Sequence, residues 1–139
     1  MKQLYRKLIP LLIVFFTQFS FAHTTSDKSD LYDQCVDHTL QKLKLDKINN
    51  TIVQSCSNET KAVYEKQIIT VLDKIRQESQ QESQPDRYLN ILKSQRLWKS
   101  YVDKECDNAG TFIGSPMYSY CPMQEYRKRV DQLREYVDL

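Results

Sequence analysis

The chain has 139 residues, of which 20 are basic, 18 are acidic and 40% are hydrophobic. It holds only two glycines and four prolines. This composition excludes a collagen-like, low-complexity or disordered chain, and two glycines supply few of the positive-φ corners that an all-β domain needs. Because the length suits one domain, we expect a single all-α domain.

Residues 1–22 have the pattern of a secretory signal peptide. Three basic residues fall in the first seven positions, residues 8–16 carry no polar side chain, and Ser20 and Ala22 are small residues where a signal peptidase reads. The apolar run is shorter than the ~20 residues that span a membrane, and no later segment is apolar enough to do so. We expect cleavage after Ala22, a mature domain of residues 23–139, and a periplasmic or secreted location.

Removal of the three basic residues of this leader changes the charge balance. The remaining chain has 17 basic and 18 acidic residues. Proteins that bind nucleic acids usually have a basic surface, so the near-neutral balance gives no sign of a nucleic-acid partner.

The four cysteines, Cys35, Cys56, Cys106 and Cys121, form an even set. In an oxidising compartment such a set predicts two disulfides, for which three pairings exist. Cys106 and Cys121 are expected to end one helix and begin the next, which favours that pair and leaves Cys35 with Cys56.

Hydrophobic residues at helical spacing predict a small bundle of about four helices. The expected helices begin at Leu31, after a cap at Asn50 or Thr51, at Pro85 and at Pro122. We expect the third helix to end near Cys106.

The segment between the last two cysteines differs from the rest of the chain. It contains both glycines, and no charged residue lies between Asp107 and Cys121. Four large side chains in it are candidates for contact with a protein partner: Phe112, Met117, Tyr118 and Tyr120. A loop of residues 107–120 that packs on the core is an equally good interpretation of the same residues.

No pattern in the chain predicts catalysis, a metal site or a cofactor. The sequence lacks a glycine-rich phosphate loop and a Gly-x-Ser-x-Gly elbow. Cys35 and His38 have the spacing of half a zinc site, but a second half is missing. His23 would begin the mature chain and could bind copper through its α-amine and imidazole, although a frayed tail is the better interpretation. Arg129 either forms a buried pair, with Asp103 as the candidate partner, or points outward.

One run of the chain matches a family pattern. It reads Gln95-Arg96-x-Trp98-x-x-Tyr101-x-Asp103-x-x-Cys106, followed by Gly110, Tyr118-x-x-Cys121, Arg129 and Leu133. Upstream, Tyr32-Asp33-Gln34-Cys35 and Cys56 fit the first two cysteines of the pattern. In these residues the chain resembles the LprI-like N-terminal domain of bacterial envelope proteins, a family named for a lysozyme inhibitor. The resemblance implies that the motif residues determine packing and disulfides.

Two functions fit these expectations. The first is an exported, disulfide-stabilised helical binding protein that inhibits a lysozyme or another cell-wall hydrolase. The alternative is a periplasmic immunity protein that blocks a toxin delivered to the envelope. Both require a protein partner and neither requires a cofactor, and a copper-binding protein and a structural envelope factor remain open.

Overall fold

A computed structural model describes residues 30–137. They form four helices, α1 (Leu31–Leu43), α2 (Asn50–Gln81), α3 (Pro85–Phe112) and α4 (Met117–Arg134), and this part of the chain contains no strand. The predicted all-α fold with two disulfides is therefore confirmed. None of the described helices is long and apolar enough to cross a membrane.

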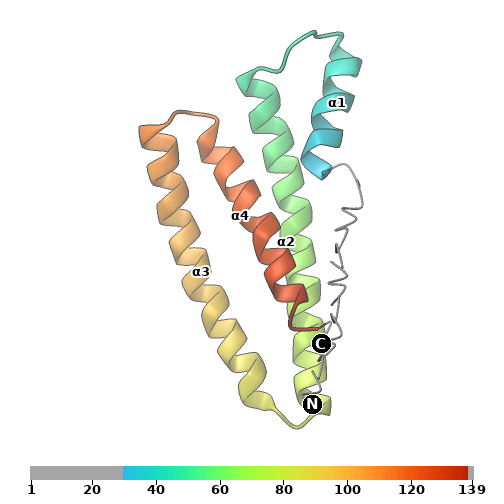
Figure 1. Ribbon diagram of the computed structural model, residues 1–139, viewed down its shortest axis with the longest axis vertical. Helices are drawn as coiled ribbons and strands as arrows, with labels where there is room; N and C mark the ends of the chain where they lie inside the picture. Colours follow the sequence, from blue (N-terminus) through green and yellow to red (C-terminus); the bar gives the residue numbers. More distant parts are fainter. Residues whose placement is uncertain (1–29, 138–139) are drawn as a thin grey trace, which may run out of the picture.

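The four helices form a bundle in which α2 and α3 are the long members. α4 lies between α2 and α3, and the short α1 lies beside the first half of α2 (Figure 1). The turns between α1 and α2 and between α3 and α4 are at one end of the bundle, and the α2–α3 turn is at the other (Figure 1). We call the first two turns, together with the helix ends that flank them, the α1–α2 tip (residues 42–49) and the α3–α4 tip (residues 112–120).

The starts of the helices follow from local hydrogen bonding. Asp30 caps α1 by accepting a hydrogen bond from the amide of Tyr32. Asn49 caps α2, because its Oδ1 accepts from the Ile52 amide at 3.0 Å. The predicted cap at Asn50 or Thr51 is thus wrong by one or two residues. Pro85 opens α3, as predicted, since proline already has the φ of a first helical turn.

The core lies where α4 faces α2 and α3. Its largest fully buried side chains are Ile75 of α2, Val102 of α3, and Met123, Val130 and Leu133 of α4. Burial of each such side chain contributes about 1.5–3 kcal/mol. α4 therefore provides the central face of the bundle, whereas α1 contributes only Tyr32 to the buried residues.

The ends of α3 and α4 differ from the prediction. α3 continues past Cys106 to Phe112, and α4 begins at Met117 rather than at Pro122. The residue that follows α3 and breaks the helix is Gly114, whose φ of +139° suits glycine, and the proline that starts α4 is Pro116. Most of the expected loop of residues 107–120 is consequently helical.

Both disulfides have the predicted pairing. Cys35 of α1 is bonded to Cys56 of α2, and Cys106 of α3 is bonded to Cys121 of α4, with Cα–Cα distances of 5.6 and 5.4 Å. Each bond cross-links the two helices of one hairpin. Neither bond joins one hairpin to the other.

Candidate functional site

The α3–α4 tip presents large apolar side chains to solvent. Phe112 is 82% exposed, Ile113 is 74% exposed and Tyr118 is 52% exposed. No charged residue lies at positions 108–120, so the surface of the tip has no strongly hydrated ionic group. Exposed apolar patches of this kind often mark protein–protein contacts.

Tyr118 is fixed against α3 by a close approach to Gly110. A Cβ atom at position 110 would lie 2.3 Å from two atoms of the Tyr118 ring, so only glycine leaves room for the ring in this position. The Tyr118 hydroxyl and the Thr111 hydroxyl are 3.3 Å apart and share a hydrogen bond. The aromatic ring is therefore held in one orientation before any partner arrives.

The other two predicted contact residues are less accessible. Met117 and Tyr120 are both half-buried. The Tyr120 ring packs edge-on against Tyr32 of α1, with 5.3 Å between the centroids. Tyr120 thus joins α4 to α1, and the exposed part of the tip consists of Phe112, Ile113 and Tyr118. Ile113 was not among the predicted contact residues, although its place in the uncharged segment could have identified it.

The residues of the family pattern lie in two environments. Gln95, Trp98, Arg129 and Leu133 belong to the interface of α3 with α4, where Leu133 is fully buried and Trp98 packs edge-on against Tyr126. Tyr101 and Asp103 are exposed on α3. Their exposure contradicts the expectation that every motif residue determines packing.

Arg129 is a buried cation, 7% exposed, between α3 and α4. Its Nε donates to Gln95 Oε1 at 2.7 Å, and its terminal nitrogens donate to Ser94 and Gln132 at 3.3 Å. The expected pairing with Asp103 is wrong, because Asp103 forms its ion pair with Lys99 one turn away on α3. Burial lowers the pKa of Arg129, yet an arginine stays protonated at neutral pH, so neutral oxygens solvate its charge.

A polar network that the sequence did not predict joins α1 to α2 and α4. The carboxylate of Asp30 accepts hydrogen bonds from the Tyr64 hydroxyl at 2.9 Å and the Tyr32 amide at 3.3 Å, and it pairs with Arg127. Burial raises the pKa of Asp30, but these hydrogen bonds and the Arg127 charge outweigh that effect and hold it below its usual value. The sequence places Asp30 at the end of a polar stretch, which gave no sign of this role.

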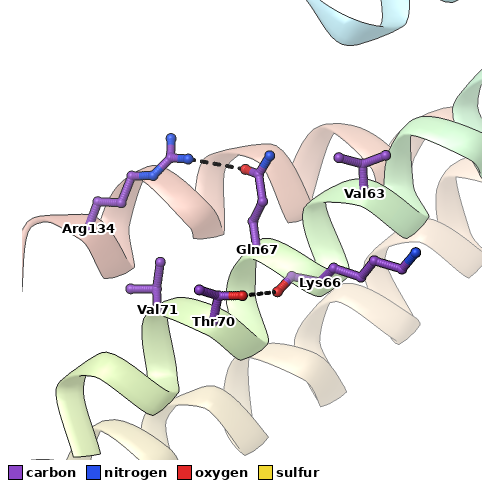
Figure 2. Close-up of a pocket in the computed structure, with 6 residues that line it drawn as sticks. All are labelled: Val63, Lys66, Gln67, Thr70, Val71 and Arg134. Atoms are coloured by element: carbon purple, nitrogen blue, oxygen red, sulfur yellow. Dashed lines mark hydrogen bonds between the residues drawn. The ribbon is translucent and has the colours of Figure 1, made fainter. Parts of the chain in front are cut away.

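Two shallow grooves lie on the sides of the bundle. The first, of about 250 Å³, lies between α2 and α4, where Arg134 donates across it to Gln67 at 3.2 Å (Figure 2). The second, of about 400 Å³, lies between α2 and α3, and its lining includes the apolar Ile69 and Leu72 and the basic Arg96 and Lys99. Neither groove brings together the paired carboxylates or nucleophile and base that catalysis requires.

The described residues contain no group of three or more His, Cys, Asp or Glu side chains that could hold a metal ion. His38 is exposed on α1. His23, the candidate copper ligand, lies outside the described residues.

A family model described as lysozyme inhibitor LprI matches residues 45–133. The matched residues include α2, α3 and nearly all of α4, with three of the four cysteines, and leave α1 outside. Comparisons with curated proteins and with solved structures gave no match.

Proposed function

Because this chain belongs to the LprI family of lysozyme inhibitors, we propose that it is an exported binding protein that inhibits a lysozyme or a related cell-wall hydrolase. The observation that supports this most directly is the α3–α4 tip, where Phe112, Ile113 and Tyr118 form an exposed, uncharged patch. The tip lies at one end of the bundle (Figure 1), where a partner can reach it.

Export is part of the proposal. The expected signal peptide of residues 1–22 lies outside the described residues, and the domain boundary at residue 23 remains a prediction. The two disulfides support an oxidising compartment, where such bonds form and persist.

The tip would inhibit by occupying the substrate cleft. Aromatic side chains supply much of the binding energy of protein interfaces, and an apolar patch brings no charge of its own that would need a partner in the cleft. Tyr118 needs little ordering on binding, because Gly110 and Thr111 already fix its ring. The entropy cost of ordering the Tyr118 ring on binding is therefore small.

Titration of the oxidised protein into a lysozyme acting on a bacterial cell-wall suspension tests the proposal. We expect dose-dependent inhibition. Phe112→Ala and Tyr118→Ala should each weaken it about tenfold or more, since truncation of an aromatic hot spot typically costs 2 kcal/mol or more. Leu89→Ala is the matched control, because Leu89 is an exposed apolar residue at the opposite end of α3.

The outcomes separate the two candidate functions. Unchanged inhibition by both tip variants, with lower stability, would assign the tip to packing. No inhibition by the unaltered protein at a large molar excess would reject the inhibitor and favour the immunity protein, whose partner is a delivered toxin.

A further inference from the structure

The α1–α2 tip carries a second exposed surface of different chemistry. Leu43, Leu45 and Ile48 are 40–56% exposed there. They are interleaved with three exposed lysines, Lys42, Lys44 and Lys47. Within residues 30–137 none of these three lysines forms an ion pair, whereas Lys74, Lys99, Lys104 and Lys128 each pair with a carboxylate on their own helix.

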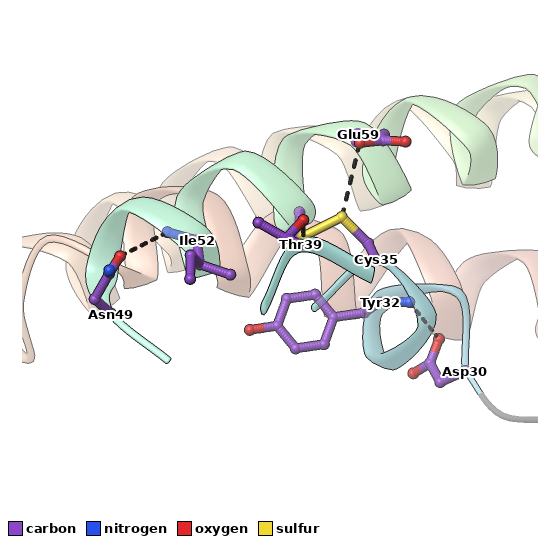
Figure 3. The surroundings of a disulfide bond; sticks show 8 residues. Asp30, Tyr32, Cys35, Thr39, Asn49, Ile52 and Glu59 are labelled. Atoms are coloured by element: carbon purple, nitrogen blue, oxygen red, sulfur yellow. Dashed lines mark hydrogen bonds between the residues drawn. A yellow bond between two sulfur atoms is a disulfide. The ribbon is translucent and has the colours of Figure 1, made fainter. Parts of the chain in front are cut away.

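This tip is an ordered structure. The amide of Leu45 donates to the carbonyl of Leu40 at 3.0 Å, and the Asn49 side chain fixes the start of α2. The Cys35–Cys56 disulfide links α1 to α2 (Figure 3). The lysines therefore project from a fixed backbone.

Lys44 has an unusual backbone conformation. Its φ of 53° and ψ of 46° are left-handed, and they let its amide close the end of α1. Glycine or asparagine normally fills such a position, because a Cβ atom is disfavoured there. Lys44 thus brings an unpaired ammonium to a position where glycine would suit the backbone better.

The α1–α2 tip and the α3–α4 tip lie at the same end of the bundle (Figure 1). The α3–α4 tip presents uncharged aromatic and aliphatic side chains, whereas the α1–α2 tip presents aliphatic side chains and lysines. Most glycoside hydrolases carry a pair of carboxyl groups in their cleft. An uncharged tip cannot complement those groups, but an ammonium can.

We propose that the α1–α2 tip is a second contact with the hydrolase, in which Lys44 meets acidic groups of the cleft while Leu43 and Leu45 pack on its wall. This inference rests on the proposed function, and it adds the chemistry that the partner must present. The partner is a hydrolase whose cleft has acidic groups next to an apolar wall.

An anionic lipid surface has related chemistry but fits the tip less well. Lipid-binding segments usually cluster four to eight basic residues, whereas this tip has three lysines and an aspartate, Asp46, among them. A cleft of limited size needs fewer cations than a membrane surface.

Lys44→Gly tests the inference, because it removes the ammonium and relieves the left-handed backbone. Ser83→Gly is the matched control, since Ser83 has a φ of 56° in the turn at the opposite end. Both variants should unfold at the same temperature as the unaltered protein or higher. We expect inhibition of a purified two-carboxylate lysozyme to weaken about five- to tenfold for Lys44→Gly alone, with a smaller difference at high salt, because salt screens exposed charges.

Lys93→Gln, which removes an exposed lysine far from both tips, controls for net charge. Undiminished inhibition by Lys44→Gly would overturn this inference and leave the proposed function intact. Absence of inhibition by the unaltered protein would overturn both. Binding to phosphatidylglycerol vesicles that Lys44→Gly abolishes, with inhibition unchanged, would overturn the inference in favour of a lipid surface.

Discussion

The α3–α4 hairpin and the α1–α2 hairpin each have a disulfide between their helices, but they are attached to the bundle in different ways. α4 buries Met123, Val130 and Leu133 between α2 and α3. α1 buries Tyr32 and packs Val36 and Leu40 against the core as partly buried residues, and it is also held by the Cys35–Cys56 disulfide and the Asp30 network. The last helix of the α3–α4 hairpin thus fills the centre of the core, whereas the first helix of the α1–α2 hairpin lies at its edge, with one buried side chain and a few specific bonds.

Removal of the disulfides should have the largest effect and should separate the hairpins. Cys35→Ala/Cys56→Ala and Cys106→Ala/Cys121→Ala should each lower the free energy of unfolding by about 3 kcal/mol, because both bonds close short loops of the unfolded chain. Hydrogen exchange should distinguish them. The first double variant should expose the amides of α1 while α2 stays protected, and the second should leave α4 protected until global unfolding. Equal protection of α1 and α4 in both variants would contradict the comparison.

Gly110→Ala should disturb only the α3–α4 hairpin. The new Cβ displaces the Tyr118 ring, and overpacking of this kind costs about 1–3 kcal/mol, which exceeds the ~1 kcal/mol that alanine contributes to a helix. In a Tyr118→Ala background the ring is gone, so the same substitution should stabilise the protein. Urea unfolding of the unaltered protein, the two single variants and the double variant measures whether the effect of Gly110→Ala on the free energy of unfolding changes sign. If Gly110→Ala destabilises both backgrounds equally, the close approach to Tyr118 is not the cause.

Asp30→Asn should weaken the attachment of α1, and the resulting loss of stability should depend on pH. The pKa of Asp30 is held below its usual value near 3.8, so its ionised form stabilises the fold. That contribution is complete above about pH 5 and is lost as the pH falls through the lowered pKa. We expect the variant to be about 1 kcal/mol less stable at pH 7, since one charged cap and ion pair is lost, and the deficit should shrink toward pH 2. Asp37→Asn, which removes an exposed carboxylate of α1, is the matched control for the loss of a negative charge.

The smallest effects on stability are expected at the two tips. Phe112→Ala and Leu43→Ala remove exposed side chains, so each should change the free energy of unfolding by less than about 0.5 kcal/mol. Circular dichroism melting curves would measure this. A loss of several degrees would mean that the tip in question packs on the bundle.

The sequence predicted the helices of the fold better than it predicted where they end. Periodic apolar residues predicted the bundle of about four helices, because burial on one face of a helix leaves a repeating pattern. The predicted end of the third helix near Cys106 and the predicted start of the fourth at Pro122 were wrong. This region contains two glycines, Gly110 and Gly114, and two prolines, Pro116 and Pro122. Only tertiary contacts decide that the turn between α3 and α4 forms at Gly114 and Pro116.

The candidate site was predictable in its composition and not in its geometry. The uncharged segment was visible in the sequence, but the half-burial of Tyr120 depends on its contact with Tyr32, far away along the chain. The role of Asp30 likewise depends on Tyr64 and Arg127. Single polar residues that act through distant partners leave no periodic signal.

The placement of the two cross-links within hairpins also determines how the chain can mature. Both bonds join cysteines that are neighbours in the cysteine order, at sequence separations of 21 and 15. In a chain that crosses a membrane from its N-terminus, Cys35 and Cys56 emerge and can be oxidised long before Cys106 arrives. The native pairs are then also the first pairs that can meet, so maturation needs an oxidant but no reshuffling of wrong bonds.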